Sequence, residues 1–495
     1  MSASFPSLNE IKSSIGQASV FPVARELMGD FDTPTAIFSR VRQHRYSFLL
    51  ESITGGENLA RYSFIGYDPT TVLRIRANHV VVEEKGSRKG FDHPDPLALL
   101  HEMTSAFHGA AYPSLPPFYA GAVGFFSYDA IRYIEKIPDK NRSDFDSEDI
   151  FYVFADKLIV FDHVENKVLL IRTMRLDGTK IEELYARAER DLDAMEKDLA
   201  APVKSMPRML PRGTKDIAVT SNFTKEEFCA QVARAKEYIY RGDIFQVQLS
   251  QRFSCPQKKI DTLAIYRALR LVNPSPYMFC LSFDDITLIG SSPEILVKQT
   301  NGVVALRPIA GTRRRGKDAA EDAALAEELI SDTKELAEHL MLIDLGRNDV
   351  GRIASYGTVR VTEKNVIERY AHVMHIVSNV EGHLAPGKSN IDVIRSAFPA
   401  GTVTGAPKVR AMEVIDELEN VRRGPYAGSV GYFSASGNMD TGIIIRTIFI
   451  KGGTIYFQAA AGIVYDSSPE KEYEETLNKV RSLIKALTLA KEISA

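Results

Sequence analysis

Residues 426–461 read YAGSVGYFSASGNMDTGIIIRTIFIKGGTIYFQAAA, and this stretch decides the fold class. Three runs in it, 426–433, 442–449 and 454–461, are rich in β-branched, aromatic and small apolar residues, and the short segments between them contain glycine. Runs of this composition predict strands, and such separators predict turns. Consecutive strands joined by short turns pair antiparallel. We therefore expect an α+β fold of large, mixed, mostly antiparallel β-sheets with surrounding helices.

The rest of the chain continues as short strands interrupted by helices. We expect further strands at residues 46–50, 62–65, 71–76, 79–84, 153–162, 167–173, 244–253, 287–291, 303–308 and 372–380. We expect helices from the spacing of apolar residues at 179–199, 224–242, 319–343, 391–396, 408–419 and 469–487. Prolines at 202, 207 and 211 mark a linker, so we divide the chain into an N-terminal region, 1–200, a linker, 201–221, and a C-terminal region, 222–495.

Composition narrows the class of protein. The net charge of −3 gives no electrostatic reason to expect a nucleic acid or an anionic membrane as partner. The three cysteines, Cys229, Cys255 and Cys280, form no CxxC pattern, which argues for a reducing compartment and against a structural zinc site. The N-terminus lacks the pattern of a signal peptide, and no apolar run reaches the roughly 18 residues of a membrane span. We therefore expect a cytoplasmic protein.

Two predicted helices each carry a pair of glutamates three residues apart, Glu335 with Glu338 and Glu472 with Glu475. Residues i and i+3 share one face of a helix, so each pair presents two carboxylates side by side. Either pair alone is also what a solvated helix surface would carry. If the two pairs converge, each like-charge contact at about 5 Å costs on the order of 3 kcal/mol, and the cluster needs a cation or bound protons. Ligation by oxygen alone favours Mg²⁺ over zinc or copper.

The turn GTVTGAPK at 401–408 precedes another predicted helix. It is not a Walker A loop, which needs four residues between its glycines and then Lys followed by Ser or Thr. Free N–H groups at the start of the helix could hold a carboxylate, although an ordinary connection between a strand and a helix would have the same sequence.

Two residues differ in character from the strands that contain them. His375 alternates with Val373 and Val377 on one face. An imidazole titrates near neutral pH and suits acid–base chemistry, although a hydrogen-bonded core histidine would show the same pattern. Arg446 follows three isoleucines, and burying it without an anion is costly. A substrate carboxylate could be its bidentate partner, and so could a carboxylate of the protein.

Five motifs in the C-terminal region, taken together and in order, carry a family resemblance. They are PIAGT at 308–312, the segment 335–349 that ends in LGRND, HIVSNVEG at 375–382, FPAGTVTGAPK at 398–408 and GIV at 462–464. The N-terminal region adds LLES at 49–52. The combination resembles the chorismate-utilising enzymes of the anthranilate synthase component I family.

The resemblance implies a lyase that converts chorismate and ammonia to anthranilate and pyruvate with Mg²⁺, the first committed step of tryptophan biosynthesis. It implies that Glu294 protonates the departing ring hydroxyl, that Thr402 orients that region, and that His375 assists the loss of pyruvate. The implied metal ligands are Glu338 and Glu475, supported by Glu335 and Glu472. The implied chorismate contacts are Gly311, Thr312, Tyr426, Arg446, Ala460, Ala461 and Gly462. Ala460 stands where many relatives have Gly, and one added methyl is a small departure.

The resemblance also implies feedback inhibition by tryptophan, with the N-terminal region regulatory and the C-terminal region binding chorismate. The implied inhibitor contacts are Ser52 and a wall for the indole made of Pro276, Tyr277 and Met278. None of the three cysteines has the Gly-flanked setting of a glutaminase nucleophile. We therefore expect ammonia from a separate glutamine amidotransferase subunit, component II, in a hetero-oligomer.

Two positions discriminate within the family. Related aminodeoxychorismate synthases of one type carry Lys where Ala310 stands, and isochorismate and salicylate synthases carry a water-activating Lys where Gln246 stands. With neither lysine present, attack by an external amine is the better interpretation. The alternatives are an aminodeoxychorismate synthase component I, which would release a different product, and a non-catalytic amino-acid sensor on the same fold, which would not turn over chorismate.

Overall fold

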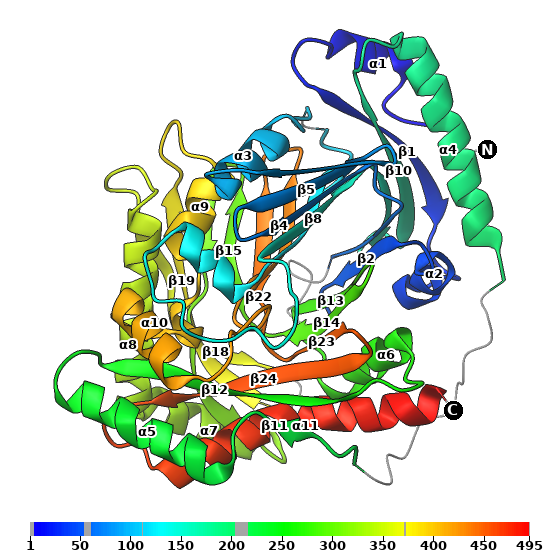
Figure 1. The fold of residues 1–495 in the computed structure, drawn as a ribbon. Helices are drawn as coiled ribbons and strands as arrows, with labels where there is room; N and C mark the ends of the chain where they lie inside the picture. Colours follow the sequence, from blue (N-terminus) through cyan, green and yellow to red (C-terminus); the bar gives the residue numbers. More distant parts are fainter. Residues whose placement is uncertain (1–3, 54–60, 111, 203–215, 371–372, 495) are drawn as a thin grey trace.

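The fold is a pair of large antiparallel sheets. A computed structural model describes residues 4–53, 61–110, 112–202, 216–370 and 373–494 of the 495-residue chain (Figure 1). Each sheet contains twelve strands among these described residues, and neighbouring strands in both pair antiparallel. The predicted α+β class with mostly antiparallel sheets is confirmed.

The first sheet runs, in spatial order, through β1 (Val20–Met28), β10 (Lys167–Arg175), β9 (Lys157–Asp162), β3 (Tyr62–Tyr67), β2 (Tyr46–Glu51), β13 (Tyr277–Phe283), β14 (Ile286–Ser292), β23 (Thr447–Lys451), β24 (Thr454–Ile463), β12 (Gln246–Pro256) and β11 (Thr220–Ser221), with β20 (Gly405–Ala406) beside β12. The second runs through β17 (Ile309–Arg314), β19 (Val373–His383), β16 (Val303–Leu306), β15 (Ile295–Thr300), β22 (Met439–Ile443), β21 (Ser429–Ser434), β7 (Gly121–Phe126), β8 (Ile150–Ala155), β4 (Thr71–Arg76), β5 (His79–Glu84) and β6 (Ser87–Asp92), with β18 (Arg360–Arg369) beside β19.

Both sheets combine strands from before and after the predicted linker. In the first sheet β2 pairs with β13, and in the second β21 pairs with β7. The boundary at 201–221 therefore separates two stretches of sequence and not two separate sheets, and most of the linker, 203–215, lies outside the described residues.

Helices cover the outer faces of the sheets. They are α1 (Leu8–Ser13), α2 (Pro34–Val41), α3 (Pro96–Ser105), α4 (Ile181–Ala200), α5 (Lys225–Tyr240), α6 (Thr262–Val272), α7 (Ala319–Ser331), α8 (Thr333–Gly351), α9 (Asn390–Ala397), α10 (Lys408–Leu418) and α11 (Pro469–Ser494), with short 3₁₀ turns η1 (Tyr128–Tyr133) and η2 (Gly401–Val403). Figure 1 shows α11 lying along β24 and β12, and α4 beside β1 and β10. Helix α8 packs on β17 and β19 of the second sheet.

Two apolar cores follow from the alternation of side chains in the strands. In β2, Phe48 belongs to the core between the two sheets, whereas Leu49 belongs to the core between the first sheet and its helices. Since successive side chains of a strand point to opposite faces, a sheet covered on both faces needs apolar residues at consecutive positions. This explains why the strand segments read as continuous apolar runs.

The predicted strand 442–449 is wrong in one important respect. It is two strands in different sheets, β22 in the second and β23 in the first, and residues 444–446 cross between them. Arg446 has a left-handed backbone with φ of 51°, which breaks the extended conformation. The predicted helix 319–343 is likewise two helices, α7 and α8, because the Asp332 side chain accepts hydrogen bonds from the backbone N–H groups of Lys334 and Glu335 and caps a new helix start.

A second crossing lies beside the first. Residues 293–294 connect β14 of the first sheet to β15 of the second. The two crossings are hydrogen-bonded to each other: the Ile443 N–H donates to the Glu294 carbonyl at 3.0 Å, and the Ser291 N–H donates to the Arg446 carbonyl at 3.2 Å. The fold therefore brings the backbones of Glu294 and Arg446 to one place, although 152 positions separate them in the sequence.

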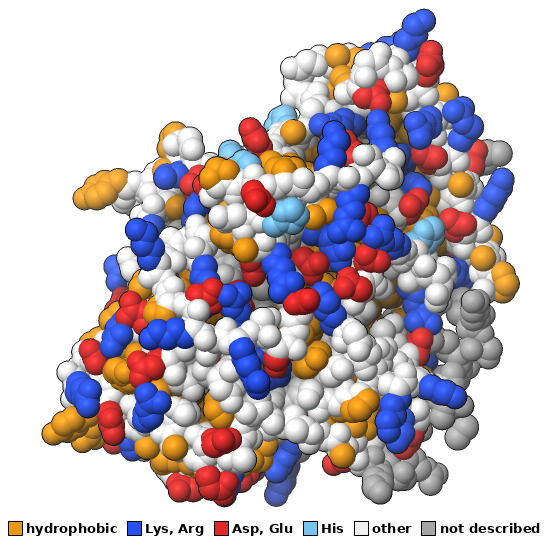
Figure 2. Space-filling view, viewed as in Figure 1, with side chains coloured by type: hydrophobic (Ala, Val, Ile, Leu, Met, Phe, Trp, Pro, Cys, Tyr) orange, Lys and Arg blue, Asp and Glu red, His pale blue; other side chains and the backbone are white. Residues whose placement is uncertain are grey.

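The molecular surface carries both signs of charge. On the face in Figure 2, basic and acidic side chains are interspersed, in keeping with a net charge of −3. Among the helices that the structure describes, none has the length and apolar character needed to span a bilayer.

Candidate functional site

A cavity of about 250 Å³ opens beside the paired crossings. It is lined by Gln246, Gln248, Pro293, Glu294, Ile309, Ala310, Gly311, Thr312, Glu338, Leu342, His375, Thr402 and Lys479. These residues come from β12, the 293–294 crossing, β17, α8, β19, η2 and α11. Six residues predicted from the sequence meet here, namely Glu294, Gly311, Thr312, Glu338, His375 and Thr402.

Glu294 is the lining residue whose acidity differs most from that of a free side chain. Its side chain reaches the cavity while the protein surrounds its carboxyl group, and this burial raises its pKa to about 7. The Thr402 hydroxyl and the Lys479 ammonium oppose that rise with smaller effects. Among the described residues, the buried Thr402 hydroxyl oxygen has no well-formed hydrogen bond. Glu294 can therefore hold a proton near neutral pH and release it inside the cavity.

His375 is held in one tautomer by the neighbouring strand. Its Nδ1 lies 2.8 Å from the Gly311 carbonyl oxygen and 3.2 Å from the Thr312 hydroxyl. A carbonyl can only accept, so we assign the proton to Nδ1, which leaves Nε2 with a lone pair. Burial lowers the pKa of His375, against the opposing effect of the Gly311 carbonyl, so the ring is neutral at neutral pH and its Nε2 is free to accept a proton.

Gly311 cannot be replaced without disturbing this arrangement. Its φ is 62°, a backbone conformation that favours glycine. A Cβ there would lie 2.9 Å from Leu329 Cδ1 and 3.1 Å from Glu335 Oε2. The PIAGT motif therefore needs glycine at 311 so that its carbonyl can reach His375.

The two acidic helix pairs lie near each other but do not share one cluster. Among the described residues, no group of three or more His, Cys, Asp or Glu side chains is placed to share a metal ion. Lys334 of α8 still acts on Glu472 of α11, whose pKa is raised mainly by burial and further by Glu475. The two helices therefore bring their acidic faces to the same region of the molecule.

Donors of the protein already engage most of these carboxylates. Glu338 accepts from Gln246 Nε2 at 3.3 Å, and Glu475 pairs with Lys479 at 2.6 Å. Glu335 pairs with Arg313 at 3.3 Å. Glu338 alone of the four lines the cavity, and the other three lie behind Arg313 or on α11. The donor set is all oxygen and anionic, which suits Mg²⁺ in chemical type.

Arg446 lies outside the residues that line the cavity and is connected to it through Lys479. Its guanidinium donates to the Lys479 backbone carbonyl. Among the described residues it has no carboxylate at ion-pair distance, so the alternative of a protein salt bridge is not realised. Burial lowers the pKa of Arg446, and Tyr426 and Glu475 oppose this effect. A carboxylate of a bound ligand could pair with the Arg446 guanidinium.

The remaining predicted substrate contacts lie on strand β24 and on the turn before β21. Burial raises the pKa of Tyr426 to about 12, so its hydroxyl is a neutral donor. The Ala460 carbonyl accepts from Lys479 Nζ at 2.9 Å. The Ala461 methyl is buried in an apolar cluster, so only its backbone can meet a ligand. A Cβ on Gly462 would lie 2.9 Å from Gln248 Nε2 and 3.0 Å from Gln246 Nε2, so glycine leaves room for two amides of the cavity wall.

Lys479 is the main residue that the sequence analysis missed. It lines the cavity and pairs with Glu475. Its ammonium donates to the Ala460 carbonyl, and its own backbone carbonyl accepts a hydrogen bond from Arg446. Its position four residues after Glu475 on a predicted helix was a usable signal, because i and i+4 side chains of opposite charge meet. Gln248, Pro293 and Leu342 had no comparable signal.

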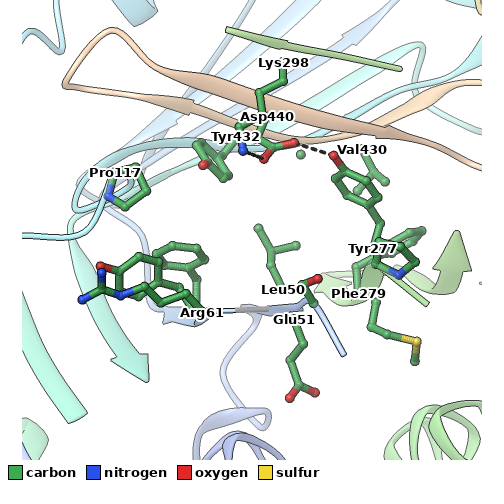
Figure 3. A pocket seen from close by; sticks show the side chains of 16 residues that line it. Leu50, Glu51, Arg61, Pro117, Tyr277, Phe279, Lys298, Val430, Tyr432 and Asp440 are labelled. Carbon is green, nitrogen blue, oxygen red and sulfur yellow. Dashed lines mark hydrogen bonds and ion pairs between the residues drawn. The ribbon is translucent and has the colours of Figure 1, made fainter. Parts of the chain in front are cut away.

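A second cavity of about 250 Å³ lies between the two sheets (Figure 3). It is lined by Leu50, Glu51, Ser52, Arg61, Tyr62, Phe64, Pro117, Pro276, Tyr277, Met278, Phe279, Lys298, Val430, Gly431, Tyr432 and Asp440. All four residues predicted to bind an inhibitor, Ser52, Pro276, Tyr277 and Met278, are among them. Most of the wall is apolar, as expected for a pocket that takes an organic ring.

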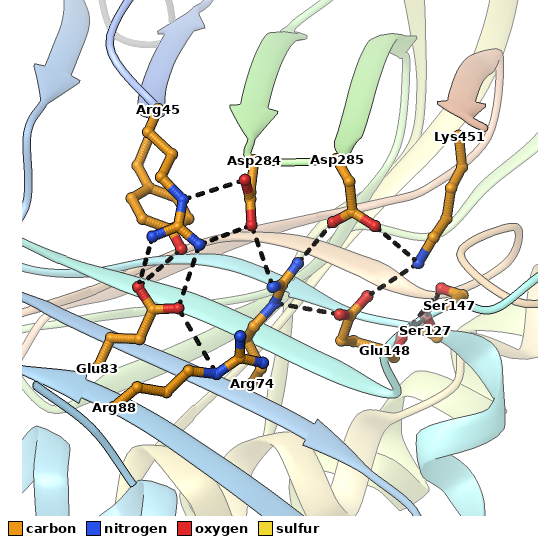
Figure 4. Close-up of polar contacts among 11 residues, drawn as sticks. Arg45, Arg74, Glu83, Arg88, Ser127, Ser147, Glu148, Asp284, Asp285 and Lys451 are labelled. Carbon is orange, nitrogen blue, oxygen red and sulfur yellow. Dashed lines mark hydrogen bonds and ion pairs between the residues drawn. The ribbon is translucent and has the colours of Figure 1, made fainter. Parts of the chain in front are cut away.

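The β13–β14 hairpin, whose strand β13 forms part of the wall of the second cavity, is anchored at its turn (Figure 4). Its turn, Asp284 and Asp285, pairs with Arg74 of β4 at 3.3 and 2.7 Å. Arg74 also pairs with Glu148 at 3.1 Å and lies over the Phe151 ring. The guanidinium is mostly buried, so this network ties the first sheet to the second more firmly than exposed ion pairs would.

Known proteins of one family are similar to this chain over nearly its whole length. The sequence model of the chorismate binding enzyme family matches residues 46–485. Anthranilate synthase component 1 of Acetivibrio thermocellus is 45% identical over 493 residues, 99% of this chain and 99% of that protein. The protein of the same name from Aquifex aeolicus (strain VF5) is 46% identical over 487 residues, 98% of each chain.

Solved structures agree as well. The crystal structure of anthranilate synthase component I from Streptococcus pneumoniae TIGR4 matches with a TM-score of 0.77 at 38% identity, covering 86% of this chain and 92% of that one. MenF, the menaquinone-specific isochorismate synthase from Escherichia coli, matches with a TM-score of 0.71 at 18% identity, covering 97% of this chain and 98% of that one, and shares the fold.

Proposed function

The chain belongs to the family of chorismate-binding enzymes, and from that premise we propose that it converts chorismate and ammonia to anthranilate and pyruvate, as the chorismate-converting component of an anthranilate synthase. The observation that carries the choice within the family is the wall of the first cavity. Gln246 and Ala310 line it at the two positions where a lysine would activate water or form a covalent adduct. Lys479, the one lysine among the described residues that line it, is engaged with Glu475 and the Ala460 carbonyl.

The first chemical step is amination of the ring. The ammonia nitrogen forms a bond to a ring carbon and gives up one proton, and the ring hydroxyl leaves as water with a proton that Glu294 supplies. A carboxyl with a pKa of about 7 is protonated in part of the population at neutral pH and can act as this acid. The Thr402 hydroxyl beside it orients the departing group. Arg446, which has no carboxylate partner among the described residues, receives a carboxylate of chorismate.

The second step is loss of pyruvate. The bond between the ring and the enolpyruvyl oxygen breaks, and the proton on the aminated ring carbon leaves to a base. His375 is that base, because Nδ1 is fixed on Gly311 and Nε2 keeps its lone pair. The ring becomes aromatic, and anthranilate forms.

Glu338 and Glu475 are the residues that would hold Mg²⁺, with Glu335 and Glu472 behind them. The bound ion supplies charge stabilisation for the ring carboxylate and the departing hydroxyl. In the ligand-free protein, Gln246 and Lys479 keep Glu338 and Glu475 in place by hydrogen bonding and ion pairing. Glu475 has to exchange Lys479 for the metal.

Ammonia is proposed to come from a separate amidotransferase subunit in a hetero-oligomer, in the cytoplasm. Burial raises the pKa of all three thiols, and that of Cys280 to about 12. A thiol activates as a nucleophile when its pKa is lowered, so these cysteines do not suit glutamine hydrolysis.

The second cavity is the proposed site of inhibition by tryptophan. Its apolar wall of Pro276, Tyr277 and Met278 would receive the indole, and Ser52 would hydrogen-bond the ligand. This cavity shares no lining residue with the first, so the inhibitor would act from a distance.

The test is incubation of the purified chain with chorismate, ammonium and Mg²⁺, followed by the fluorescence of anthranilate. Anthranilate formation without added enzyme is the background, and His375→Met is the matched control for the second step. A non-aromatic aminated product from the wild type would assign an aminodeoxychorismate synthase. Absence of any turnover of chorismate would overturn the proposal and favour the non-catalytic amino-acid sensor.

A further inference from the structure

The side chains of Arg423 and Glu419 fill a gap in one edge of strand β12. On this edge β12 pairs with β20 at its start and with β11 near its end, and no described strand pairs with it between them. In the gap, the Gln248 carbonyl accepts from Arg423 at 2.7 Å, and the Ser250 N–H donates to Glu419 at 2.9 Å. The two side chains therefore satisfy backbone groups that a neighbouring strand would otherwise pair.

Arg423 joins this edge of β12 to the turn that carries Thr402. Its Nη1 donates to the Val403 carbonyl at 2.7 Å, and the Glu419 carboxylate accepts from its Nη2 at 2.6 Å and its Nε at 2.9 Å. The Gln248 N–H donates to a carbonyl of the same turn at 2.9 Å. Since Thr402 and Gln248 both line the first cavity, the guanidinium connects two parts of its wall.

The guanidinium also lies between two aromatic rings. Its central carbon is 4.8 Å from the centroid of the Tyr128 ring and 5.7 Å from that of the Tyr426 ring, which are cation–π distances. Four of its five N–H groups have acceptors, two on Glu419 and one each on the Gln248 and Val403 carbonyls. A lysine presents three N–H groups from a single nitrogen and does not match this planar arrangement.

This ion pair is the most deeply buried one among the residues that the structure describes. The Arg423 side chain is 1% exposed and that of Glu419 is 4% exposed. Taking two charges out of water costs about as much as their attraction returns, so a buried pair is weak evidence of a stabilising role. The fixed geometry that the pair imposes on two backbone segments of the cavity wall is the better account of it.

We propose that Arg423 is a positioning residue for the amination step: it holds the turn of η2 so that the Thr402 hydroxyl stays beside Glu294. Its hydrogen-bond acceptors belong to β12, to η2 and to the end of α10, and none belongs to β19, which carries His375. Loss of the guanidinium should therefore impair proton transfer from Glu294 and spare the loss of pyruvate. This assignment rests on the proposed function and deepens it.

Arg423→Lys is the first test, because the ammonium still neutralises Glu419 but cannot bond every acceptor of a planar guanidinium. At a constant concentration of free ammonia, kcat should fall by about 10- to 100-fold, the order of loss that a displacement of about 1 Å causes. The Thr402 hydroxyl opposes the rise in the pKa of Glu294, so the high-pH limb of kcat/KM should move to higher pH. Anthranilate should remain the product, without release of the aminated intermediate.

A double-mutant cycle with Thr402→Val separates positioning from general distortion. If Arg423 acts through Thr402, Arg423→Lys should add less than about threefold to the loss in Thr402→Val and should not move the pH limb again. Arg25→Lys is the matched control, because the Arg25 side chain is 3% exposed and pairs with three carboxylates of α4, none of which lines the first cavity. This control should leave kcat and the pH limb unchanged.

Hydrogen exchange gives a readout that needs no turnover. In Arg423→Lys, the amides of 246–252 and 401–404 should exchange about 10-fold faster, since each segment loses a bond that holds it closed, and those of 373–380 should be unchanged. If Arg423→Lys does not fold, Arg423→Met combined with Glu419→Gln removes both charges and leaves neither unpaired. The same changes in activity and exchange are expected in that double variant.

The outcomes separate this inference from the proposed function. A wild-type kcat and pH limb in Arg423→Lys, or a loss that adds fully to that of Thr402→Val, would overturn the positioning role while the wild type still makes anthranilate. Faster exchange throughout the chain, or release of the aminated intermediate, would overturn it as well, because either would show a general distortion. A wild type that does not convert chorismate would refute the proposed function and the amination role together.

Discussion

Replacing Glu294 with Gln should stabilise the ligand-free protein at pH 8 and nearly abolish its activity. Burial moves the pKa of this carboxyl from its ordinary 4.5 to about 7. At about 1.4 kcal/mol per pH unit, an ionised Glu294 therefore costs the folded state about 3 kcal/mol. Part of the side chain reaches the open cavity, where water would screen it, so we expect about 1–3 kcal/mol.

The raised pKa of Glu294 sets the direction in which the stability difference between Glu294→Gln and wild type changes with pH. The folded protein keeps the proton up to about pH 7, whereas the unfolded chain releases it above about 4.5. The destabilisation is therefore absent well below pH 4.5, grows between pH 4.5 and 7, and is complete above 7. Gln is neutral throughout, so the stability of Glu294→Gln relative to wild type should rise over the same window.

The assay is thermal unfolding of wild type and Glu294→Gln at pH 5 and pH 8, without chorismate or Mg²⁺. An unfolding entropy of about 2.1 cal/mol/K per residue gives about 1 kcal/mol/K for 495 residues, so Tm should rise by about 1–3 °C at pH 8 and by less than about 1 °C at pH 5. Glu474→Gln, on the exposed side of α11, is the matched control and should shift Tm at neither pH.

Activity is measured on the same variants. Loss of a general acid costs about 10²- to 10⁴-fold in turnover, and Glu474→Gln should retain full activity. Identical Tm values for wild type and Glu294→Gln at pH 8 would refute the argument that burial raises this pKa. A variant that is more stable but fully active would instead remove Glu294 from the chemistry.

The other predictions concern the metal, the second step, regulation and the nitrogen source. Glu338→Gln and Glu475→Gln should each weaken the apparent affinity for Mg²⁺ by at least about 10- to 100-fold, the loss that outer ligands cause at other metal sites; unchanged Mg²⁺ dependence in both would contradict the assignment. His375→Met should release the aminated, non-aromatic intermediate, detected by mass spectrometry, and full anthranilate formation would make the residue structural. Ser52→Phe should fill the second cavity and raise the tryptophan concentration needed for half-inhibition; a wild type that is not inhibited by millimolar tryptophan would refute the inhibitor site. The purified chain should use ammonium but not glutamine, and glutamine-dependent anthranilate from the chain alone would disprove the need for a partner.

The sequence predicted the strands well because their cause is local. Continuous apolar runs follow from sheets covered on both faces, as Phe48 and Leu49 show. The switch of residues 442–449 from one sheet to the other has no local cause, because the run is equally apolar on both sides of the switch. Only Arg446 interrupts it, and the sequence analysis took this as a sign of a ligand and not of a bend.

Some features of the candidate site were likewise predictable from the sequence, and others were not. The predicted residues that meet in the first cavity were found through the resemblance: five of the six lie in the quoted motifs, and Glu294 was carried over from the resemblance outside them. The separation of the acidic pairs was not predictable, because it depends on Arg313 and Lys479 reaching Glu335 and Glu475. The helix start at Asp332 was predictable in principle, since Asp three residues before Glu335 is a capping signal.

Two strands lead from the second cavity toward Glu294 and Arg446, which would give the proposed inhibitor a structural route to the first site. Strand β15 begins next to Glu294 and carries Lys298 into the second cavity, four residues or about 13 Å away. Its partner β22 carries Asp440 and leads to Arg446. A ligand that changes the spacing of Lys298 and Asp440 therefore acts on the strands that position the acid and the guanidinium. Packed cores are not continuously deformable, so a displacement of β15 and β22 at the second cavity can be carried along these strands to Glu294 and Arg446.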